Sequence, residues 1–148
     1  MSGHRGKLEW FGGNEHALAM YAAIVDLAQT WDDLVDRDKP VDEAQINNAF
    51  LIALVYLQAN PFYQSIQPQV LPMWLTTVSS FEAANKFERE KDEHGVELAH
   101  MLRYAGAQII AYAIHMCVGP VKAREYIPEM WKTVADERFE AYRQEIMR

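Results

Sequence analysis

Residues 14–36 read NEHALAMYAAIVDLAQTWDDLVD, and this stretch indicates how the chain folds. Apolar side chains recur every three or four positions over most of it, which is the spacing of an α-helix rather than of a β-strand. Asn14 is a suitable N-cap, and Lys39-Pro40 stops the helix shortly after residue 36. The stretch therefore predicts one long helix that is apolar around most of its circumference and acidic at its C-terminal end.

The rest of the chain repeats this helical pattern with short connections, and no segment alternates as a strand does. Capping residues and prolines mark where the further helices begin and end. In order, the expected segments are an irregular leader at 1–13, in which Trp10 and Phe11 pack against the bundle, and helices over about 14–36, 42–60, 72–89, 96–118 and 121–147, the last interrupted at Pro128. A loop or a short helix is expected between the second and the third of these helices. We expect a single all-α domain over residues 1–148, an antiparallel helical bundle of about five helices.

Composition limits the classes of function. Half of the 148 residues are apolar, and the net charge of -7 argues against binding nucleic acid or an anionic membrane surface. The single cysteine, Cys117, excludes an internal disulfide and a cysteine-based zinc site. The charged start is not followed by the apolar stretch of a signal peptide, and no apolar run approaches the roughly 18 residues of a membrane span. We therefore expect a cytoplasmic protein, and these features are compatible with a homo-oligomer.

Three aspartates, Asp32, Asp33 and Asp36, stand at the end of the first predicted helix. On a helical wheel Asp36 falls in line with apolar positions and the other two flank it, so they form no obvious solvent stripe. The C-terminal end of a helix is its negative pole, where each acidic group costs about 0.3–1 kcal/mol. A bound divalent cation would reverse this cost, because Mg2+ prefers ionised carboxylates as ligands. The alternative is a solvated helix end that Arg37 and Lys39 neutralise.

Polar side chains also interrupt the apolar faces of the third and fourth predicted helices. Asn85 and Glu88 continue one such face, and Glu97, His100 and Arg103 occupy the other. Both polar ends adjoin the connection between the two helices. In an up-and-down bundle this connection lies at the same end as the C-terminus of the first helix. The order of the helices therefore predicts that these side chains meet the three aspartates.

The run WDDLVDRD at residues 31–38 resembles the D-D-x-x-D motif of class I isoprenoid and terpene synthases. In that family the motif ends a helix and holds Mg2+ against the substrate diphosphate. The resemblance implies metal-binding roles for Asp32 and Asp36, with Asp33 in support. It also implies a reduced isoprenoid-synthase-like bundle as the fold.

The second metal motif of the same family has Asn, then Ser or Thr, then Glu, at four-residue intervals. Asn85, Arg89 and Glu93 keep this spacing, with Arg89 where the family has a hydroxyl ligand, and Glu88 is an alternative last ligand. The chain as a whole also looks like small proteins of tailed phages.

The main hypothesis is a Mg2+-dependent helical protein that handles a diphosphate-bearing small molecule. Metal and arginine charge would stabilise the negative charge that develops on a leaving phosphate. No catalytic residue is assigned, and a lyase, a transferase or a pyrophosphohydrolase is compatible with the pattern. The predicted metal ligands are Asp32, Asp33, Asp36, Glu88 and Glu97, and the predicted substrate-binding residues are Asn85, Arg89, His100 and Arg103.

Two alternatives remain open at this stage. An all-α nucleotide pyrophosphatase of the MazG or dimeric dUTPase kind also gathers carboxylates from two helices around Mg2+. A non-catalytic interaction protein, such as a phage-encoded effector, would instead use exposed aromatic side chains as a contact patch. The candidates for that patch are Trp10, Phe11, Phe62, Tyr63 and Trp131.

Overall fold

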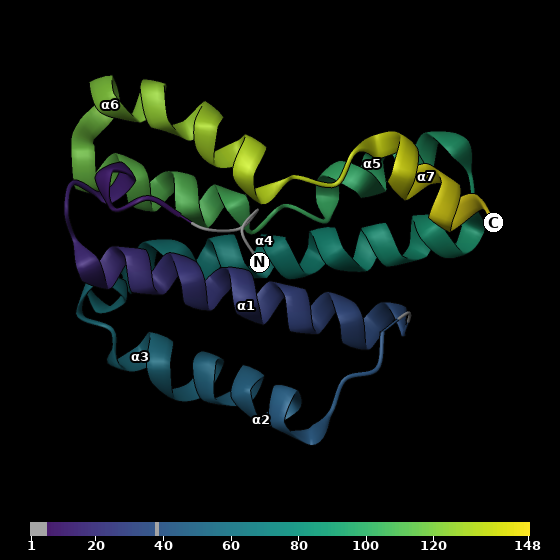
Figure 1. Cartoon of the computed structure of the whole chain (residues 1–148), viewed down its shortest axis with the longest axis horizontal. Coiled ribbons are helices and arrows are strands. Elements are labelled where there is room, and N and C mark those ends of the chain that lie inside the picture. The colour runs from purple at the N-terminus through teal and green to yellow at the C-terminus, as the bar shows by residue number, and fades with distance from the viewer. Residues whose placement is uncertain (1–5, 38) are drawn as a thin grey trace.

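The computed structural model describes residues 6–37 and 39–148, and this part of the chain is helical almost throughout, with no β-strand (Figure 1). The prediction of an all-α protein is confirmed. The segments are the 3-10 helix η2 (Leu8–Phe11), α1 (Glu15–Asp36), α2 (Glu43–Leu51), the π-helix η3 (Ile52–Tyr56), α3 (Leu57–Ala59), α4 (Pro61–Glu90), α5 (Glu93–Leu102), α6 (Ala107–Val134) and α7 (Phe139–Met147).

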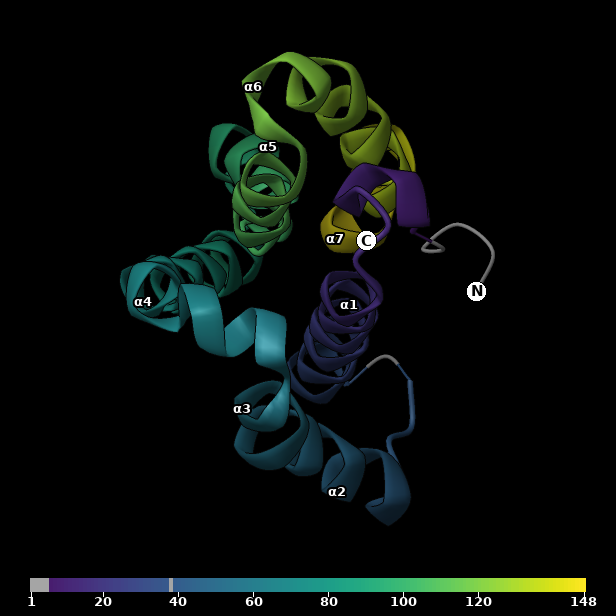
Figure 2. The ribbon, with the colours of Figure 1, turned by 90° about the vertical axis from the view of Figure 1, so that its left-hand side faces the viewer.

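The long helix α1 lies at the middle of the molecule and contacts both α4 and α6 (Figures 1 and 2). On one side the continuous run α2–η3–α3 folds back along α1, and on the other side lie α5, α6 and α7. The main core forms where η2, α1, α4 and α6 meet, and it includes Met20, Val70 and Ile110. A second, smaller core of Ala84, Val96, Ala99 and Tyr142 joins α4, α5 and α7.

The leader is more ordered than expected, because residues 8–11 form η2 rather than an irregular segment. Trp10 and Phe11 are almost fully buried, with 0% and 1% of their surface exposed. The Trp10 ring meets the ring of Tyr21 edge to face at 5.8 Å. Gly12 ends η2 with a φ of 59°, a backbone conformation that glycine adopts without strain. The leader is therefore part of the core, while residues 1–5 of it lie outside the described residues.

The third predicted helix starts eleven residues too late, because α4 begins at Pro61 rather than at Pro72. The side chain of Asn60 accepts a hydrogen bond from the backbone N–H of Tyr63, and Pro61 occupies the first helical position. Pro68 also lies inside the helix, where each proline removes one backbone donor without ending it. Because α4 is one continuous helix, its C-terminal end still lies near the C-terminal end of α1, as the order of the helices predicts.

The last part of the chain confirms one predicted boundary and moves another. The helix stop predicted at Gly119-Pro120 is confirmed, because Gly119 is non-helical, with a φ of 79° and a ψ of 174°, and the chain reverses sharply there within the segment labelled α6 (Figure 1). The helix then continues through Pro128 to Val134, so the interruption predicted at Pro128 does not occur. The break lies instead at residues 135–138, ahead of α7.

One stretch of the described residues meets the length and composition of a membrane span, contrary to the expectation from the sequence. Within Glu93–Met147, an 18-residue window reaches a mean hydropathy of 1.2, which is enough by length and composition for a membrane span. The same window suits a core helix, and Ile109, Ile110 and Ile114 of α6 are buried in the main core.

Candidate functional site

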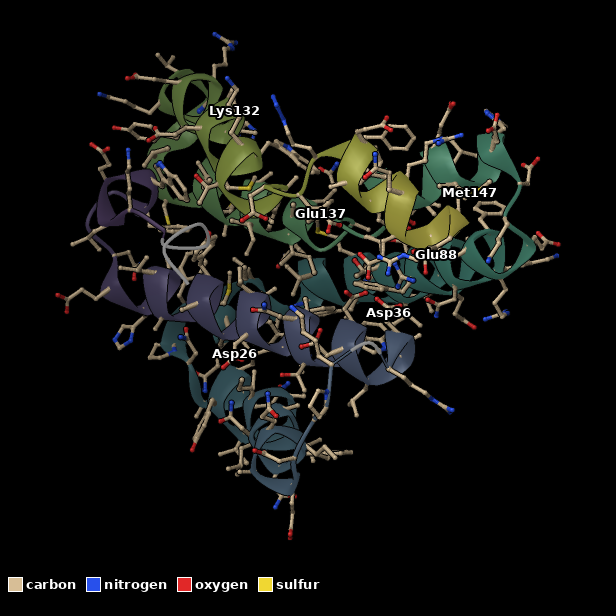
Figure 3. The ribbon with its side chains drawn as sticks, turned by 45° about the vertical axis from the view of Figure 1, so that its right-hand side comes forward. Asp26, Asp36, Glu88, Lys132, Glu137 and Met147 are labelled. Atoms are coloured by element: carbon tan, nitrogen blue, oxygen red, sulfur yellow. The ribbon has the colours of Figure 1, made fainter. Side chains whose placement is uncertain are left out.

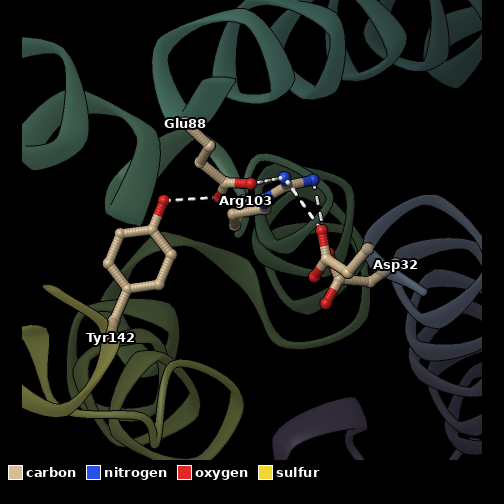
Figure 4. Close-up of polar contacts among 5 residues, drawn as sticks. Asp32, Glu88, Arg103 and Tyr142 are labelled. Carbon is tan, nitrogen blue, oxygen red and sulfur yellow. Dashed lines mark hydrogen bonds and ion pairs between the residues drawn. The ribbon is translucent and has the colours of Figure 1, made fainter. Parts of the chain in front are cut away.

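A buried arginine joins three of the predicted functional carboxylates. Arg103 is the residue that follows α5, in the tight turn that separates α5 from α6, and its side chain is only 8% exposed. Around it lie Asp32 and Asp36 from the end of α1, Glu88 from the end of α4 and Tyr142 from α7 (Figures 3 and 4). We call these five residues the Arg103 cluster.

Glu88 is the main partner of the arginine. Arg103 Nε donates to Glu88 Oε2 at 2.9 Å, and Nη2 donates to Glu88 Oε1, so the guanidinium and the carboxylate pair through two parallel bonds. The phenolic hydroxyl of Tyr142 donates a third bond to Glu88, at 2.5 Å to Oε2. Bidentate pairing of this kind fixes the orientation of both side chains. The arginine is therefore held by the fold before any ligand arrives.

The two aspartates bind the arginine less closely than Glu88 does. Asp32 Oδ1 lies 3.2 Å from Nη1, and Asp36 Oδ1 lies 3.5 Å from Nη2. The contact with Asp32 is an ion pair without the angles of a hydrogen bond, and both atoms in it are buried without another partner. The side chains of Asp32 and Asp36 are 39% and 27% exposed, so this side of the cluster is open.

Burial changes the acidity of the cluster. It raises the pKa of Asp32, and the charges of Glu88 and Asp33 add to this effect, although Arg103 opposes it. Burial also raises the pKa of Tyr142, which the hydrogen bond to Glu88 raises further. Burial alone would lower the pKa of Arg103, but the bond and charge of Glu88 outweigh it and raise the pKa. The arginine therefore stays charged, while Asp32 loses its proton less readily than an exposed aspartate.

Four residues of the Arg103 cluster, Asp32, Asp36, Arg103 and Tyr142, line one end of a cavity of about 870 Å³ between α1, α4, α6 and α7. Six carboxylates and two basic side chains, Lys39 and Arg103, line it. The carboxylates are those of Asp32, Asp33, Asp36, Asp136, Glu137 and Glu145. Because Glu88 already pairs with Arg103, the lining presents an excess of negative charge to anything that enters.

The remainder of the cavity wall is largely apolar and aromatic. Trp31 of α1 stacks on Phe81 of α4 with 4.4 Å between the ring centres, and the guanidinium carbon of Arg103 lies 5.8 Å from the centre of the Phe81 ring. Deeper along α4, Trp74 Nε1 donates to the hydroxyl of Tyr63 at 3.1 Å. These rings give the cavity an apolar surface directly beside its charged end.

His100 and Glu137 line the side of the cavity that faces α7. His100 Nε2 lies 2.9 Å from the carbonyl oxygen of Glu137, and since a carbonyl only accepts, this nitrogen carries the proton. The imidazole also packs between the rings of Tyr104 and Phe139. Burial raises the pKa of Tyr104 to about 12 and raises that of the Glu137 carboxyl. His100 is thus fixed by the fold and contacts the segment between α6 and α7.

The predicted convergence of side chains occurs for part of the set. Asp32, Asp36, Glu88 and Arg103 meet in the Arg103 cluster, and Asp33 and His100 line the same cavity. Asn85 and Arg89 do not line it. They line a neighbouring cavity of about 520 Å³ together with Asp36, Glu88 and Glu145. The two cavities share Asp36, Glu145 and Ile146, so Asn85 and Arg89 lie beside the cavity that His100 lines and not in it, and their role in binding a substrate stays a prediction.

Glu97 does not join the cluster, which corrects its assignment as a metal ligand. It lies on the exposed face of α5, because Val96 and Ala99 are the residues that face the smaller core. Glu93, which keeps the last position of the second motif's spacing, is also outside and pairs with Arg143 on the surface. The helix packs through Gly95, Val96 and Ala99, and both glutamates are exposed.

Two site residues were missed, and a sequence signal existed for one of them. Tyr142 lies 39 positions beyond Arg103 in the chain, and only the folding of α7 onto α5 brings it to Glu88. Phe81 could have been found, since it lies on the inward stripe of its helix seven residues before Glu88. The aromatic patch expected on the surface is wrong, since Trp10, Phe11 and Tyr63 are buried.

The carboxylates do not present a ready set of Mg2+ ligands. Within residues 6–37 and 39–148, no group of three or more His, Cys, Asp or Glu side chains is arranged to hold a metal ion. The guanidinium of Arg103 lies between Asp32, Asp36 and Glu88 and supplies the positive charge that a metal would otherwise bring. The arrangement as it stands does not fit a bound Mg2+, because the arginine would first have to move.

No protein-family model, no curated protein and no solved structure matches the chain. The resemblances to isoprenoid synthases and to phage proteins therefore stay predictions.

Proposed function

We propose that this protein binds a small, mainly apolar molecule that carries one positively charged group. The observation that carries the proposal is the pairing of an aromatic cavity of about 870 Å³ with an acidic end. A cavity of this size is in the range of small-molecule sites, which combine apolar walls with a few placed polar groups. The apolar part of the ligand would lie along Trp31, Trp74 and Phe81, and its cation would lie near Asp32, Asp33 and Asp36.

The charge of the lining favours a cation over an anion. Arg103 would be the natural anchor for an anionic group, but its charge is already matched by Glu88 through two hydrogen bonds. The Asp32 side chain is 39% exposed on the open side of the cluster, and a carboxylate with one ion pair can accept further hydrogen bonds, which an ammonium group can donate. Aromatic faces beside the carboxylates add to the attraction for an organic cation.

Three probes with the same eight-carbon chain test this proposal: octylamine, octanol and octanoate, with binding to the full chain measured by calorimetry. At pH 7 we expect the amine to bind about tenfold more tightly than the alcohol, which corresponds to about 1.4 kcal/mol, and the carboxylate to bind most weakly. The preference for the amine should shrink as salt is added, since part of the cavity is open to solvent. Equal binding of all three, or tighter binding of octanoate, contradicts the proposal.

Variants identify the group that selects the cation. In Asp33→Asn the preference for octylamine over octanol should fall severalfold, with octanol binding unchanged. The matched control is Glu82→Gln on α4, an exposed carboxylate that does not line the cavity, which should leave all three affinities unchanged. A loss of preference in the control would point to the overall charge of the protein instead of to this site.

The Mg2+-dependent handling of a diphosphate-bearing molecule is the second candidate. The observation in its favour is that Asp32, Asp33 and Asp36, the residues of the D-D-x-x-D run, all line the charged end of an apolar cavity. A reduced isoprenoid-synthase-like bundle belongs to this candidate. It requires Arg103 to leave the aspartates. The probe is Mg2+ with inorganic pyrophosphate, which should raise the melting temperature of the parent chain and not that of Asp32→Ala. An unchanged melting temperature of the parent chain counts against it.

A further inference from the structure

One long segment of this chain contains no charged residue. From Ala44 to Phe81 the sequence has no Asp, Glu, Lys, Arg or His, although charged residues make up 24% of the whole chain. This uncharged segment, residues 44–81, comprises most of α2, all of η3 and α3, and the larger part of α4. The entire net charge of -7 therefore comes from the rest of the protein.

The uncharged segment exposes large apolar side chains along α2 and η3. Phe50 is 62% exposed, Leu54 is 68% exposed, and Leu51, Val55 and Tyr56 are between 43% and 53% exposed. Figure 2 shows α2 and α3 at the edge of the molecule, against α1 and away from α6. Only the opposite side of this run is used for packing, through Ile52 and Leu57.

A second exposed apolar stripe lies on α4. Leu71, Leu75 and Val78 follow one another at helical spacing and are 51%, 71% and 39% exposed. Both helical runs border the cavity, since Ala53 of η3, next to Leu54, and Leu71 of α4 line it. Together the eight exposed residues on α2, η3 and α4 form what we call the apolar face.

The apolar face is large enough for a stable protein interface. A half-exposed side chain of this size presents on the order of 100 Å², so the eight residues present roughly 800 Å². This is about the area that each partner contributes to a specific interface of ordinary size. Exposed apolar patches of this extent on a folded domain mark interaction sites.

We propose that the apolar face is the interface of a homodimer, covered by the same face of a second copy. Two copies that each carry a charge of -7 repel one another, and the uncharged segment is where they can approach with the least repulsion. The face offers no cation or anion to pair with a charged partner, whereas an apolar surface is complementary to itself across a two-fold axis. The assignment does not depend on which ligand the cavity takes.

The dimer has a consequence for the cavity. Leu71 lines the cavity while half of its surface is exposed, so the cavity wall and the apolar face share this residue. A partner seated on the apolar face covers the exposed side of this wall. The cavity is therefore completed on this side by the second copy.

The experiment is to measure the mass of the full chain in solution by sedimentation equilibrium, over about a hundredfold range of concentration. We expect a dimer that dissociates on dilution. Leu54→Glu and, separately, Leu75→Glu should shift the dissociation constant by at least about a hundredfold, because each buries an unpaired carboxylate in an apolar contact on both copies. Both side chains are about 70% exposed in one copy, so the helical circular dichroism of the variants should be unchanged.

Val121→Glu is the matched control, since Val121 is 75% exposed on α6, outside the apolar face. It should leave the dimer intact. A chain that is monomeric at every concentration overturns the proposal, and so does a dimer that Leu54→Glu and Leu75→Glu do not weaken. A chain that stays monomeric but binds phosphatidylcholine vesicles through Leu54 and Leu75 assigns the face to a lipid surface and likewise overturns it.

Discussion

The Arg103 cluster and the uncharged segment differ in the kind of side chain that each withdraws from solvent. The cluster brings three carboxylates and one arginine together, with Arg103 and Glu88 almost completely buried. The uncharged segment leaves Leu54 and Leu75 about 70% exposed. Charged groups are thus withdrawn from solvent at one place and apolar groups are presented to it at another.

This difference shows how the two regions depend on their surroundings. A buried charge pair is stable only while both members are present, because each alone would be a desolvated charge. Exposed leucines cost the isolated chain little, and they gain free energy only when something covers them. Substitutions in the cluster should therefore change folding, and substitutions on the apolar face should change association.

The largest effect is expected from Arg103→Met, which leaves Glu88 buried without its cation. We expect the free energy of unfolding to fall by about 3–5 kcal/mol in urea denaturation. The matched control is Arg143→Met, which removes an exposed ion pair with Glu93 and should cost at most about 1 kcal/mol. If both variants lose the same amount, the buried pair is no more important to the fold than a surface pair.

Tyr142→Phe should have the next largest effect, because it removes the hydroxyl that donates to the Glu88 carboxylate. A hydrogen bond to a charged group contributes about 1.5–3 kcal/mol, so the unfolding free energy should fall by this amount. Tyr56→Phe is the counterpart in the uncharged segment, where the ring is 53% exposed, and it should change stability by less than about 0.5 kcal/mol. Equal effects of the two variants would remove the distinction between the regions.

Asp42→Ala tests how the start of α2 is held, immediately before the uncharged segment. Asp42 accepts from the backbone N–H of Gln45 while Gln45 accepts from the backbone N–H of Asp42. Loss of this capping box should cost about 1 kcal/mol in thermal or urea unfolding. Asp42→Asn keeps an accepting oxygen and should recover most of the loss, and a failure to recover it would mean that the charge matters and not the cap.

The smallest effect is expected from the dependence of stability on pH at Asp32. Because burial raises the pKa of this carboxyl in the fold, the folded state binds the proton more tightly than the unfolded state. Stability from this group is therefore present at low pH and is lost as pH rises through the raised pKa. From about pH 4 to pH 7, the melting temperature of Asp32→Asn should improve relative to the parent chain.

Asp26→Asn on the same helix is the control for this measurement, since Asp26 is exposed on the side of α1 that faces α2 (Figure 3). It serves as the reference for removing one exposed carboxylate from the same helix. A melting temperature of Asp32→Asn that falls relative to the parent would show that the ion pair with Arg103 outweighs the burial of Asp32.

The sequence predicts the helical fold and half of the site well, because both follow from local pattern and chain order. The helix over 14–36 is right to within one residue, and the order of the helices brings Asp32, Asp36, Glu88 and Arg103 together. What spacing could not show is that Arg103 would bind Glu88 instead of a ligand. Such pairing depends on the rotation of α5 against α4, which no local pattern specifies.

The errors in the helix boundaries arise where tertiary packing outweighs a local sequence signal. The sequence predicts helix boundaries at Pro72 and Pro128, whereas α4 and α6 continue through these positions. The packing of Tyr63, Ile66 and Val70 in the main core stabilises the first part of α4 despite its prolines. Tertiary burial here outweighs a local preference, and burial is what a single sequence shows least directly.

Gly119 affects how wide the cavity is. The chain reverses at this residue, so Ile110 before it and Val134 after it face the same interior space. A Cβ at this position would touch nothing within 4 Å, so the requirement for glycine comes from its φ of 79° alone. The spacing between the helix before Gly119 and the helix after it is thus set by the backbone conformation of Gly119. The width of the cavity therefore depends on a residue that does not line it.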